Sequence, residues 1–434
     1  MSQTAVGLLG IALLLIMFFS RMPVAYVMTL VGFLGFGYVV SFESALKLLS
    51  RDFFDIYSSY GLTVIPLFIF MGQIAFNAGI SRRLYDSAYK TVGSYRGGLA
   101  VATVLACCAF GAVCGSSPAT AATMATVGMP EMRRYGYGAE LSAGTVASAG
   151  GLGMLMPPSV VMIVYGILTE QSIGALFVSG IVPAVFMTLI FALTVWVYCL
   201  IYPEQGPAGE HFTWAEKLRS LSKTSETMAV FVLVMGGLFL GVFTPNEAGA
   251  VGSAAVLAVA LFRRQLTWAG FVKSVYETLR TSCMVLLLIA GAVVFGHFLA
   301  VTRIPFNVAN WVASFNWPGF AIIGLIVLVY LIGGCFIDAL ALIMLTIPIF
   351  YPIITNLGYD PIWFGVIIVL VTQMGVITPP VGINVYVVNG IAQDVPLEKI
   401  FKGALPFLLA LVVGTGIITF VPQIATWLPN LMYH

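Results

Sequence analysis

Charged residues are scarce in this chain. They make up 8% of its 434 residues, whereas hydrophobic residues make up 60% and the mean hydropathy is +1.03. A soluble protein needs about 25% charged residues to cover its surface, so this composition excludes a soluble globular protein. The apolar segments continue from end to end and leave no stretch for a folded soluble domain. We therefore predict an all-α polytopic membrane protein whose main solvent is the lipid bilayer.

Several groups that carry chemistry are also missing. The chain has three histidines and six cysteines, none of them in a CxxC pair, so a zinc site is not expected. No GxxxxGK[ST] motif occurs, which excludes a P-loop for ATP. Paired catalytic acids and a nucleophile–histidine pair are absent as well. We predict a protein that is not an enzyme and has no nucleic-acid partner.

What the sequence does contain is a series of long apolar runs. They cover about residues 4–20, 22–41, 60–79, 97–130, 138–170, 174–201, 226–243, 246–262, 281–302, 319–352, 360–394 and 400–428. The start, Met1-Ser-Gln-Thr, lacks the basic residues of a cleaved signal peptide, so the first run is expected to remain as a span. Short amphipathic segments at 43–56 and 265–278 are predicted to lie along the membrane interface.

A polar stretch at 203–225 divides the chain into two halves that resemble each other. A shift of 222 residues superimposes Pro23 on Pro245, Gly97 on Gly319, Pro130 on Pro352, Gly136-Tyr137 on Gly358-Tyr359, Gly153 on Gly375 and Pro157-Pro158 on Pro379-Pro380. One constant offset over this length indicates an internal duplication. We predict a first repeat at 1–202, a cytoplasmic linker at 203–225 and a second repeat at 226–434.

Two segments of each half are unusual for simple spans. The runs 97–130 and 319–352 are too long for one crossing, and glycine and polar residues interrupt both, which predicts re-entrant hairpins. The runs 138–170 and 360–394 each carry a Pro-Pro pair at mid-depth. Because proline lacks a backbone donor and clashes with the preceding turn, each of these is predicted to be a broken span.

The basic residues predict the topology. With each hairpin counted as zero crossings, each half crosses five times, so the second half is inverted relative to the first. With the N-terminus outside, 16 of the 19 Lys and Arg residues, Arg21 among them, fall inside. If the long runs were ordinary spans, Arg82 and Arg133 would lie on opposite faces. We predict a bacterial inner-membrane protein with periplasmic termini, a cytoplasmic loop at 130–137 and a periplasmic loop at 353–360. An aromatic belt is expected near the outer boundary from Trp311, Trp317, Trp363 and Trp427.

The two hairpin tips carry the polar groups of interest. Broken helices leave backbone N–H and C=O groups unpaired inside the membrane, where an ion or a substrate can satisfy them. The first tip, Gly115–Thr120, offers hydroxyls and carbonyls, which suit a small alkali cation. The alternative is that these hydroxyls bond back to the helix or bridge packed helices.

The second tip, 333–338, ends at Asp338, the only acid in its apolar run. Such a residue costs about 2.5–3.5 kcal/mol at the membrane centre, and we predict an ion-linked role for it. The alternative is that Asp338 caps the second half-helix, and the two roles are compatible. Away from the tips, Thr244-Pro245-Asn246-Glu247 predicts a helix start with a capping box.

Four motifs together resemble one known family. They are Gly115-Ser-Ser-Pro-Ala-Thr-Ala-Ala-Thr123, Pro157-Pro158-Ser159 with Tyr165-Gly166, Gly241-Val-Phe-Thr-Pro-Asn-Glu-Ala248, and Thr378-Pro-Pro-Val-Gly-Ile-Asn384. Over nearly the whole chain they resemble the large, or M, subunit of tripartite ATP-independent periplasmic (TRAP) transporters. The resemblance implies an elevator-type ion-transporter fold, with hairpins and broken spans as the moving part. It also implies Na⁺ coupling, a separate four-helix membrane subunit (Q-type) and a periplasmic substrate-binding protein (P-type).

The resemblance further implies two or more Na⁺ ions and a small organic acid such as a C4-dicarboxylate or sialic acid. The residues expected to hold Na⁺ are Ser116, Ser117, Gly153 and Pro157 at the first site, and Gly334, Asp338, Thr378 and Pro379 at the second. The residues expected to hold the substrate carboxylate between the tips are Ser117, Ser159, Gly382 and Asn384. The main alternative is a single-component sodium/carboxylate symporter that needs no binding protein; a channel and a membrane enzyme are weaker ones.

Overall fold

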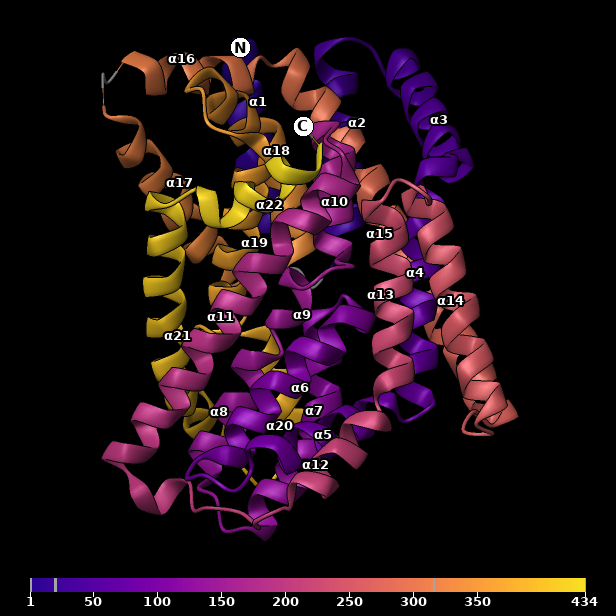
Figure 1. Ribbon diagram of the computed structural model, residues 1–434. Helices are drawn as coiled ribbons and strands as arrows, with labels where there is room; N and C mark the ends of the chain where they lie inside the picture. Colours follow the sequence, from indigo (N-terminus) through magenta and orange to yellow (C-terminus); the bar gives the residue numbers. More distant parts are fainter. Residues whose placement is uncertain (1, 19–21, 315–316, 434) are drawn as a thin grey trace.

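The computed structural model describes residues 2–18, 22–314 and 317–433. Within these ranges the chain is helical, with one isolated β-bridge between Arg96 and Ala208 and no strand. Figure 1 shows long helices that run roughly side by side, with shorter ones across both ends. Arg21, which the topology count placed inside, and the chain ends Met1 and His434 lie outside the described residues.

The helices follow the predicted apolar runs closely. In the first half they are α1 (Gln3–Phe18), α2 (Val24–Val39), α3 (Phe42–Ser58), η1 (Tyr60–Thr63), α4 (Val64–Asn77), α5 (Ile80–Val92), α6 (Gly98–Cys114), α7 (Ser117–Arg134), α8 (Ala139–Ala149), α9 (Leu152–Leu155), α10 (Val160–Thr169) and α11 (Ile173–Ile201). The polar stretch holds η2 (Pro203–Gln205) and α12 (Trp214–Ser222). The second half has α13 (Ser225–Phe239), α14 (Pro245–Phe262), α15 (Trp268–Val301), α16 (Ile304–Ser314), α17 (Gly319–Gly334), α18 (Ala339–Asn356), α19 (Pro361–Gly375), α20 (Ile383–Ile391), α21 (Leu397–Phe420) and α22 (Gln423–Tyr433).

The helix bounds of the two halves are related by the offset found in the sequence. A shift of 222 residues carries α7 onto 339–356, which are the bounds of α18. The same shift carries α10 onto 382–391, within one residue of the start of α20. It also carries α1 and α2 onto α13 and α14 to within one residue at each end. The backbone therefore starts and stops helices at matching places in both halves.

Both runs predicted as hairpins are interrupted at their polar residues. Gly115 caps α6 in a left-handed conformation (φ 64°), which favours glycine, and α7 begins at Ser117. In the second half α17 ends at Gly334, and the side chain of Asp338 caps the start of α18. In each pair the two helices pack against one another. The interruptions lie where the sequence predicts them, and the re-entrant course of the pairs stays a prediction.

The two Pro-Pro pairs also lie in helix interruptions. Pro157-Pro158 falls between α9 and α10, and Pro379-Pro380 falls between α19 and α20. The segment Ala139–Leu155 meets α10 at a bend of 40°. Proline explains the end of the preceding helix in both places, because it cannot donate to the helical ladder.

The lengths of the helices make the chain a multi-pass membrane protein. Among the described residues, six helices are long and apolar enough to cross a bilayer, or seven if the bent pair is one span. The outer helices expose large apolar side chains, such as Leu189 and Leu193 of α11. By contrast, α19 is buried on every side from Trp363 to Gly375, as expected of an all-apolar helix inside a bundle. The five crossings of each half stay a prediction.

Two predictions are wrong. Residues 265–278 do not form a separate interfacial segment, because α15 is one continuous helix of 34 residues. At 1.5 Å per residue it is about 51 Å long, and neither Pro nor Gly interrupts it between Phe271 and Ala290.

Trp363 does not join an aromatic belt. Its ring is buried, and its indole N–H donates to the carbonyl of Ile418 at 3.1 Å.

The predicted helix start at Thr244 is confirmed. Pro245 is the first residue of α14, and the Thr244 hydroxyl accepts a hydrogen bond from the N–H of Glu247 at 3.3 Å. In return, the Glu247 carboxylate accepts from the N–H of Thr244 at 2.8 Å. This reciprocal pair satisfies two donors that have no partner within the helix.

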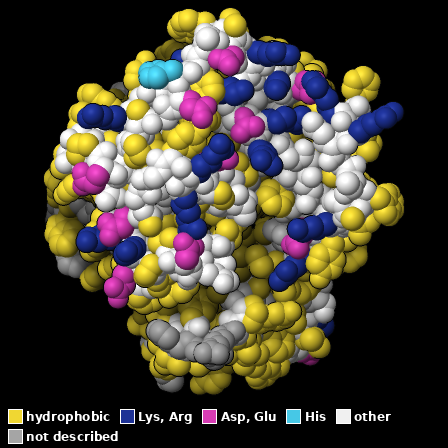
Figure 2. Space-filling view, turned by 90° about the horizontal axis from the view of Figure 1, so that it is seen from below, with side chains coloured by type: hydrophobic (Ala, Val, Ile, Leu, Met, Phe, Trp, Pro, Cys, Tyr) yellow, Lys and Arg dark blue, Asp and Glu magenta, His cyan; other side chains and the backbone are white. Residues whose placement is uncertain are grey.

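One end of the bundle gathers charged side chains, with Lys and Arg in excess (Figure 2). Figure 2, the view from below, shows many Lys and Arg side chains over the end that carries α5 and α12 in Figure 1. Arg133 and Arg134 end α7, and Arg133 forms an ion pair with Asp394 at 2.8 Å. A basic end is what the positive-inside prediction requires. That this end faces the cytoplasm stays a prediction.

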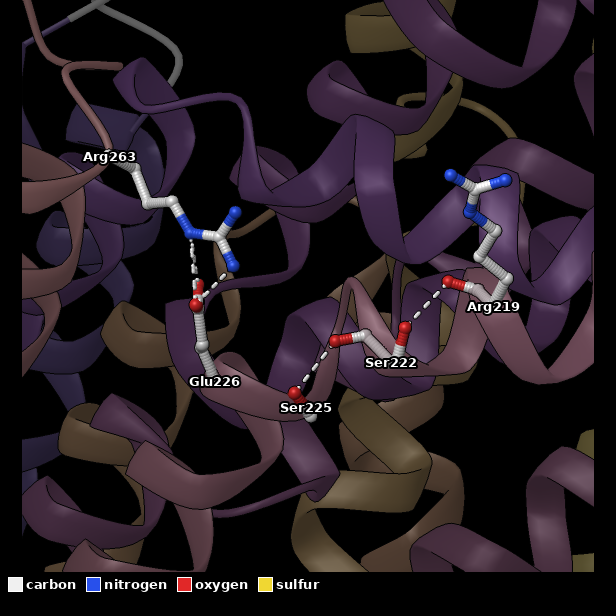
Figure 3. A network of polar contacts seen from close by, with 5 residues as sticks. All are labelled: Arg219, Ser222, Ser225, Glu226 and Arg263. Atoms are coloured by element: carbon white, nitrogen blue, oxygen red, sulfur yellow. Dashed lines mark hydrogen bonds and ion pairs between the residues drawn. The ribbon is translucent and has the colours of Figure 1, made fainter.

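A short polar network ties the linker to the second half (Figure 3). The Nε–H of Arg263, at the end of α14, donates to both carboxylate oxygens of Glu226 at 2.9 and 3.0 Å. The Ser225 hydroxyl donates to the Ser222 carbonyl at 2.7 Å, and the Ser222 hydroxyl donates to the Arg219 carbonyl at 2.8 Å. These contacts hold the ends of α12, α13 and α14 together.

Candidate functional site

A cavity of about 290 Å³ lies between the two hairpin tips. The first tip contributes residues 114–119 and the second contributes 338–340. The other walls come from α4, α9, α10 and α15. We call this space the central cavity. Its volume is near the lower end of the range for small-molecule sites, so two tips that are distant in the sequence face one ligand-sized space.

Three helices begin at the central cavity. Ser117, Val160 and Ala339 are the first residues of α7, α10 and α18, and all three line it. The first N–H groups of a helix have no acceptor within the helix, and the helix dipole places partial positive charge at this end. The Asp338 side chain caps α18 and the Ser159 hydroxyl caps α10, whereas no side chain caps α7, so the start of α7 is the end most open to an anion such as a carboxylate.

Asp338 is the only charged side chain among the described residues that line the central cavity. Its carboxylate accepts a hydrogen bond from the N–H of Leu340 at 3.0 Å, so the capping role given as the alternative is confirmed, and the ion-linked role stays a prediction. The lining also offers the neutral polar side chains of Ser116 and Ser117. Positive charge for a bound anion therefore has to come from the helix ends and from cations, which Asp338 would attract.

The first tip lies directly against the first broken span. A Cβ atom on Gly153 would lie 2.5 Å from the Thr120 hydroxyl and 3.0 Å from the Ser116 carbonyl oxygen. A Cβ atom on Gly115 would overlap the carbonyl oxygen of Pro158. The structure thus brings the predicted ligands Ser116 and Gly153 together. The Thr120 hydroxyl donates back to the Ser116 carbonyl at 2.8 Å, which is the bonding proposed as the alternative for this tip.

The second tip meets the second broken span in the same way. A Cβ atom on Gly334 would lie 3.1 Å from the Cα atom of Gly375. The N–H of Val381 donates to the carbonyl of Cys335 at 3.3 Å. Only glycine allows backbones to approach this closely. Each tip is therefore seated on the break of its own half.

The remaining predicted cation ligands lie in the two breaks. Pro157 is buried, Thr378 is half-buried and Pro379 is exposed. The hydroxyl of Thr378 donates back to the carbonyl of Met374 at 2.7 Å. Of the residues predicted for the second cation site, Asp338 lines the central cavity, whereas Gly334, Thr378 and Pro379 do not.

Asn384 joins the two halves at their centre. Its side-chain nitrogen donates to the Ser117 hydroxyl at 2.7 Å and to the Ala147 carbonyl at 2.9 Å. The Ser117 hydroxyl also lies 3.0 Å from the side-chain oxygen of Asn384. Asn384 is fully buried. A single amide therefore connects the first tip, the first broken span and the second broken span.

The residues predicted to hold substrate are not all at the cavity surface. Ser117 lines the central cavity, whereas Ser159, Gly382 and Asn384 do not. Ser159 is buried and caps α10 by accepting from the N–H of Met162 at 3.4 Å. Gly382 starts α20 in a left-handed conformation (φ 57°), close to the ring of Phe401. Of these three residues, Asn384 contacts the lining through its hydrogen bond to Ser117, and Ser159 immediately precedes the lining residue Val160.

Sequence reasoning missed two polar residues of the lining, Gln73 of α4 and Thr281 of α15. Both are half-buried. Gln73 lies within the apolar run at 60–79, farther from its ends than Thr63 and Asn77, so it was open to detection. Thr281 lies at the edge of its run, next to Arg280, where a polar residue carries no signal.

Gln373 is a further residue that the sequence reasoning missed. It is fully buried, and neither atom of its amide has a hydrogen-bond partner among the described residues. A Cβ atom on Gly151 would lie 2.5 Å from its side-chain nitrogen. The shift of 222 residues relates Gly151 to Gln373. Equivalent positions of the two halves therefore touch one another.

Comparisons with known proteins point to transport. Residues 11–424 match the family described as the tripartite ATP-independent periplasmic transporter, DctM component. The C4-dicarboxylate TRAP transporter large permease protein DctM of Pseudomonas aeruginosa is 38% identical over 387 residues, which cover 89% of this chain and 90% of that protein. The sialic acid TRAP transporter large permease protein SiaM of Vibrio cholerae is 30% identical over 414 residues, which cover 95% of this chain and 96% of that protein.

A solved structure shares the fold. The YdaH transporter of Alcanivorax borkumensis aligns with a TM-score of 0.64 at 14% identity, over 89% of this chain and 88% of that one. At this identity the likeness concerns the arrangement of helices alone.

Proposed function

The chain belongs to the DctM component family of tripartite ATP-independent periplasmic transporters, and from this membership we propose that it imports a small organic acid by sodium-coupled secondary transport. It is the large membrane subunit, and its relatives are named as permeases, so we propose no enzymatic activity. The substrate class is a C4-dicarboxylate, sialic acid or a related carboxylate, as named for those relatives.

The central cavity is the observation that carries this proposal. Three helices begin at it, and the start of α7, which no side chain caps, would attract the substrate carboxylate. The two tips that line it come from opposite halves of the chain. Movement of either tip would open the cavity on one side, which is what alternating access requires.

We place one Na⁺ between the first tip and its broken span, with ligands from Ser116, Ser117, Gly153 and Pro157. A second Na⁺ lies between the other tip and its broken span, with ligands from Gly334, Asp338, Thr378 and Pro379. The close seating of each tip on its own break supports both sites. Asp338 has no acidic counterpart in the first tip, so the second site should bind Na⁺ more tightly than the first.

The mechanism we propose is an elevator. Hairpins and broken spans of two inverted repeats form the moving part, and the other spans form the scaffold. Support comes from the matching helix bounds of the two halves and from the hydrogen bonds of Asn384, which tie the first hairpin to both broken spans.

Two Na⁺ ions supply enough free energy for this task. One charge that moves down 100 mV yields about 2.3 kcal/mol, and a tenfold gradient adds about 1.4 kcal/mol per ion. After the cost of carrying a monoanion inward, about 5 kcal/mol remain for two ions. That supports accumulation of the acid by a few thousand-fold without ATP.

The working complex would contain two further proteins. A small four-helix membrane subunit and a periplasmic substrate-binding protein are expected for the family that the chain resembles. We propose the bacterial inner membrane as the location, with both termini periplasmic and the basic end of Figure 2 in the cytoplasm.

The decisive test is uptake of a labelled organic acid into proteoliposomes that hold this chain and its small partner. The Na⁺ gradient and the periplasmic binding protein are each supplied or omitted. Uptake that needs both supports the proposal. Uptake that needs Na⁺ alone would favour the single-component symporter, and uptake without a Na⁺ gradient would refute sodium coupling.

A further inference from the structure

A groove of about 990 Å³ runs between α11 and α21, the last long helix of each half. The two helices contact each other and lie together on the left side of Figure 1. Neither the predicted site residues nor the central cavity share any residue with this groove. We call it the α11–α21 groove.

Apolar side chains form most of the α11–α21 groove. They are Ile190, Leu193, Val197 and Ile201 of α11, and Leu405, Pro406, Leu409, Ala410 and Val413 of α21. Leu193 and Leu409 are 55% and 67% exposed, so the groove faces outward rather than into the core. On a multi-pass protein such a surface faces lipid. The occupant is therefore expected to be a lipid chain.

The length of the groove matches one leaflet of a bilayer. From Ile190 to Ile201, α11 rises about 16 Å at 1.5 Å per residue. The hydrocarbon core is about 30 Å thick, so the apolar part covers about half of it. A single acyl-chain region fits this span, and a molecule that crosses both leaflets does not.

The polar end of the groove carries charges of both signs. Glu140, Glu204 and Lys402 line it, together with Tyr198 and Tyr202. Glu204 is held near the start of α8 because the N–H of Gly138 donates to the carbonyl of Gln205 at 3.0 Å. Two carboxylates and one ammonium group thus surround the position of a headgroup.

We propose that the α11–α21 groove binds one phospholipid whose headgroup carries a phosphate and a primary ammonium, as in phosphatidylethanolamine. Lys402 pairs with the phosphate, and Glu140 and Glu204 accept hydrogen bonds from the ammonium. Phosphatidylglycerol offers no cation to the two carboxylates. Phosphatidylcholine offers a cation without N–H donors, so it can form no hydrogen bonds with them.

The test is native mass spectrometry of the purified full-length chain. The chain is mixed with phosphatidylethanolamine, phosphatidylcholine and phosphatidylglycerol of identical acyl chains in equal amounts. We expect one tightly retained lipid per chain, with phosphatidylethanolamine retained most. Equal retention of all three, or a preference for phosphatidylglycerol, would overturn the assignment of the headgroup.

Matched variants locate the lipid on the protein. Glu204→Gln should lower the preference for phosphatidylethanolamine about two- to fivefold, the range for exposed ion pairs. Lys402→Met should weaken retention of all three lipids by about the same factor, because each of them carries the phosphate. Lys399→Met and Glu398→Gln change exposed charges on the same helix that do not line the groove, and should have no effect.

A bulky substitution tests the acyl-chain region. Leu409→Trp should displace the retained lipid whatever its headgroup. Leu189→Trp, at an equally exposed position of α11 outside the groove, should not. If both tryptophan variants retain the lipid as the parent chain does, the α11–α21 groove is not its site.

Discussion

Asp338 offers the sharpest test of the proposed ion coupling, because its two roles can be separated. Asparagine is as good an N-cap as aspartate, so Asp338→Asn keeps the hydrogen bond to the Leu340 N–H and removes the charge. A hydrogen bond to a charged group is worth about 1.5–3 kcal/mol. If the contact of the carboxylate with Na⁺ contributes the same free energy, its loss should raise the Na⁺ concentration that gives half-maximal uptake about 10- to 150-fold.

Asp338→Ala removes the cap as well as the charge. We expect the same loss of Na⁺ affinity, and in addition a decrease of about 1 kcal/mol in the free energy of unfolding. The assays are Na⁺-dependent uptake in proteoliposomes and thermal unfolding of the purified chain. Uptake should fall severalfold or more at Na⁺ concentrations that just saturate the parent protein, while the protein remains folded.

Asp360 provides the matched control for both variants. It caps α19 by accepting from the N–H of Ile362 at 2.7 Å, yet it is exposed and does not line the central cavity. Asp360→Asn should leave both assays unchanged, and Asp360→Ala should affect only stability. The reasoning is refuted if Asp338→Asn transports with the Na⁺ half-saturation of the parent chain, because Asp338 would then be only a helix cap.

Three further predictions follow from the packing and the topology. Gly375→Ala should lower the free energy of unfolding by about 1–3 kcal/mol, because its Cβ would lie 2.5 Å from the Cα of Gly334. Gly416→Ala, whose Cβ would have no atom within 4 Å, is the control in the same thermal unfolding assay. Equal effects of the two substitutions would contradict the close packing of the second tip on its broken span. Asn384→Ala should lower stability by about 1–3 kcal/mol by leaving buried groups unpaired; an unchanged melting temperature would contradict its bridging role. In intact cells, an impermeant thiol reagent should label Leu357→Cys but not Arg134→Cys, and labelling of both would contradict the inverted arrangement.

Local signals in the sequence were sufficient to find the helix interruptions. Pro157-Pro158 and Pro379-Pro380 end helices because proline cannot donate to the ladder, whichever neighbours surround it. The capping box at Thr244 is equally local, since its partner lies three residues away. Asp338 stood out because an acid inside an apolar run is rare, and it does line the central cavity.

Features that depend on tertiary packing were beyond the sequence. Thr281 lines the central cavity only because α15 passes the two tips, and nothing near it in the chain indicates this. Asn384 could be placed beside a helix break from the sequence, but its hydrogen bonds to Ser117 and Ala147 join residues that are far apart in the sequence. Trp363 was assigned to an aromatic belt from its position in the sequence alone. Its hydrogen bond to the Ile418 carbonyl instead places its ring within the helix bundle.

The contact between Gly151 and Gln373 bears on how such a chain could arise. In a dimer of two identical subunits, a residue at the symmetry axis meets its own copy. Two glutamines would compete for one space there, and two glycines would leave a void that costs packing energy. Within one duplicated chain, each copy can mutate on its own. If the two halves arose by duplication, the glycine–glutamine pair became possible only once the two copies could diverge in sequence, and a symmetric ancestor of two identical subunits would have filled this position differently.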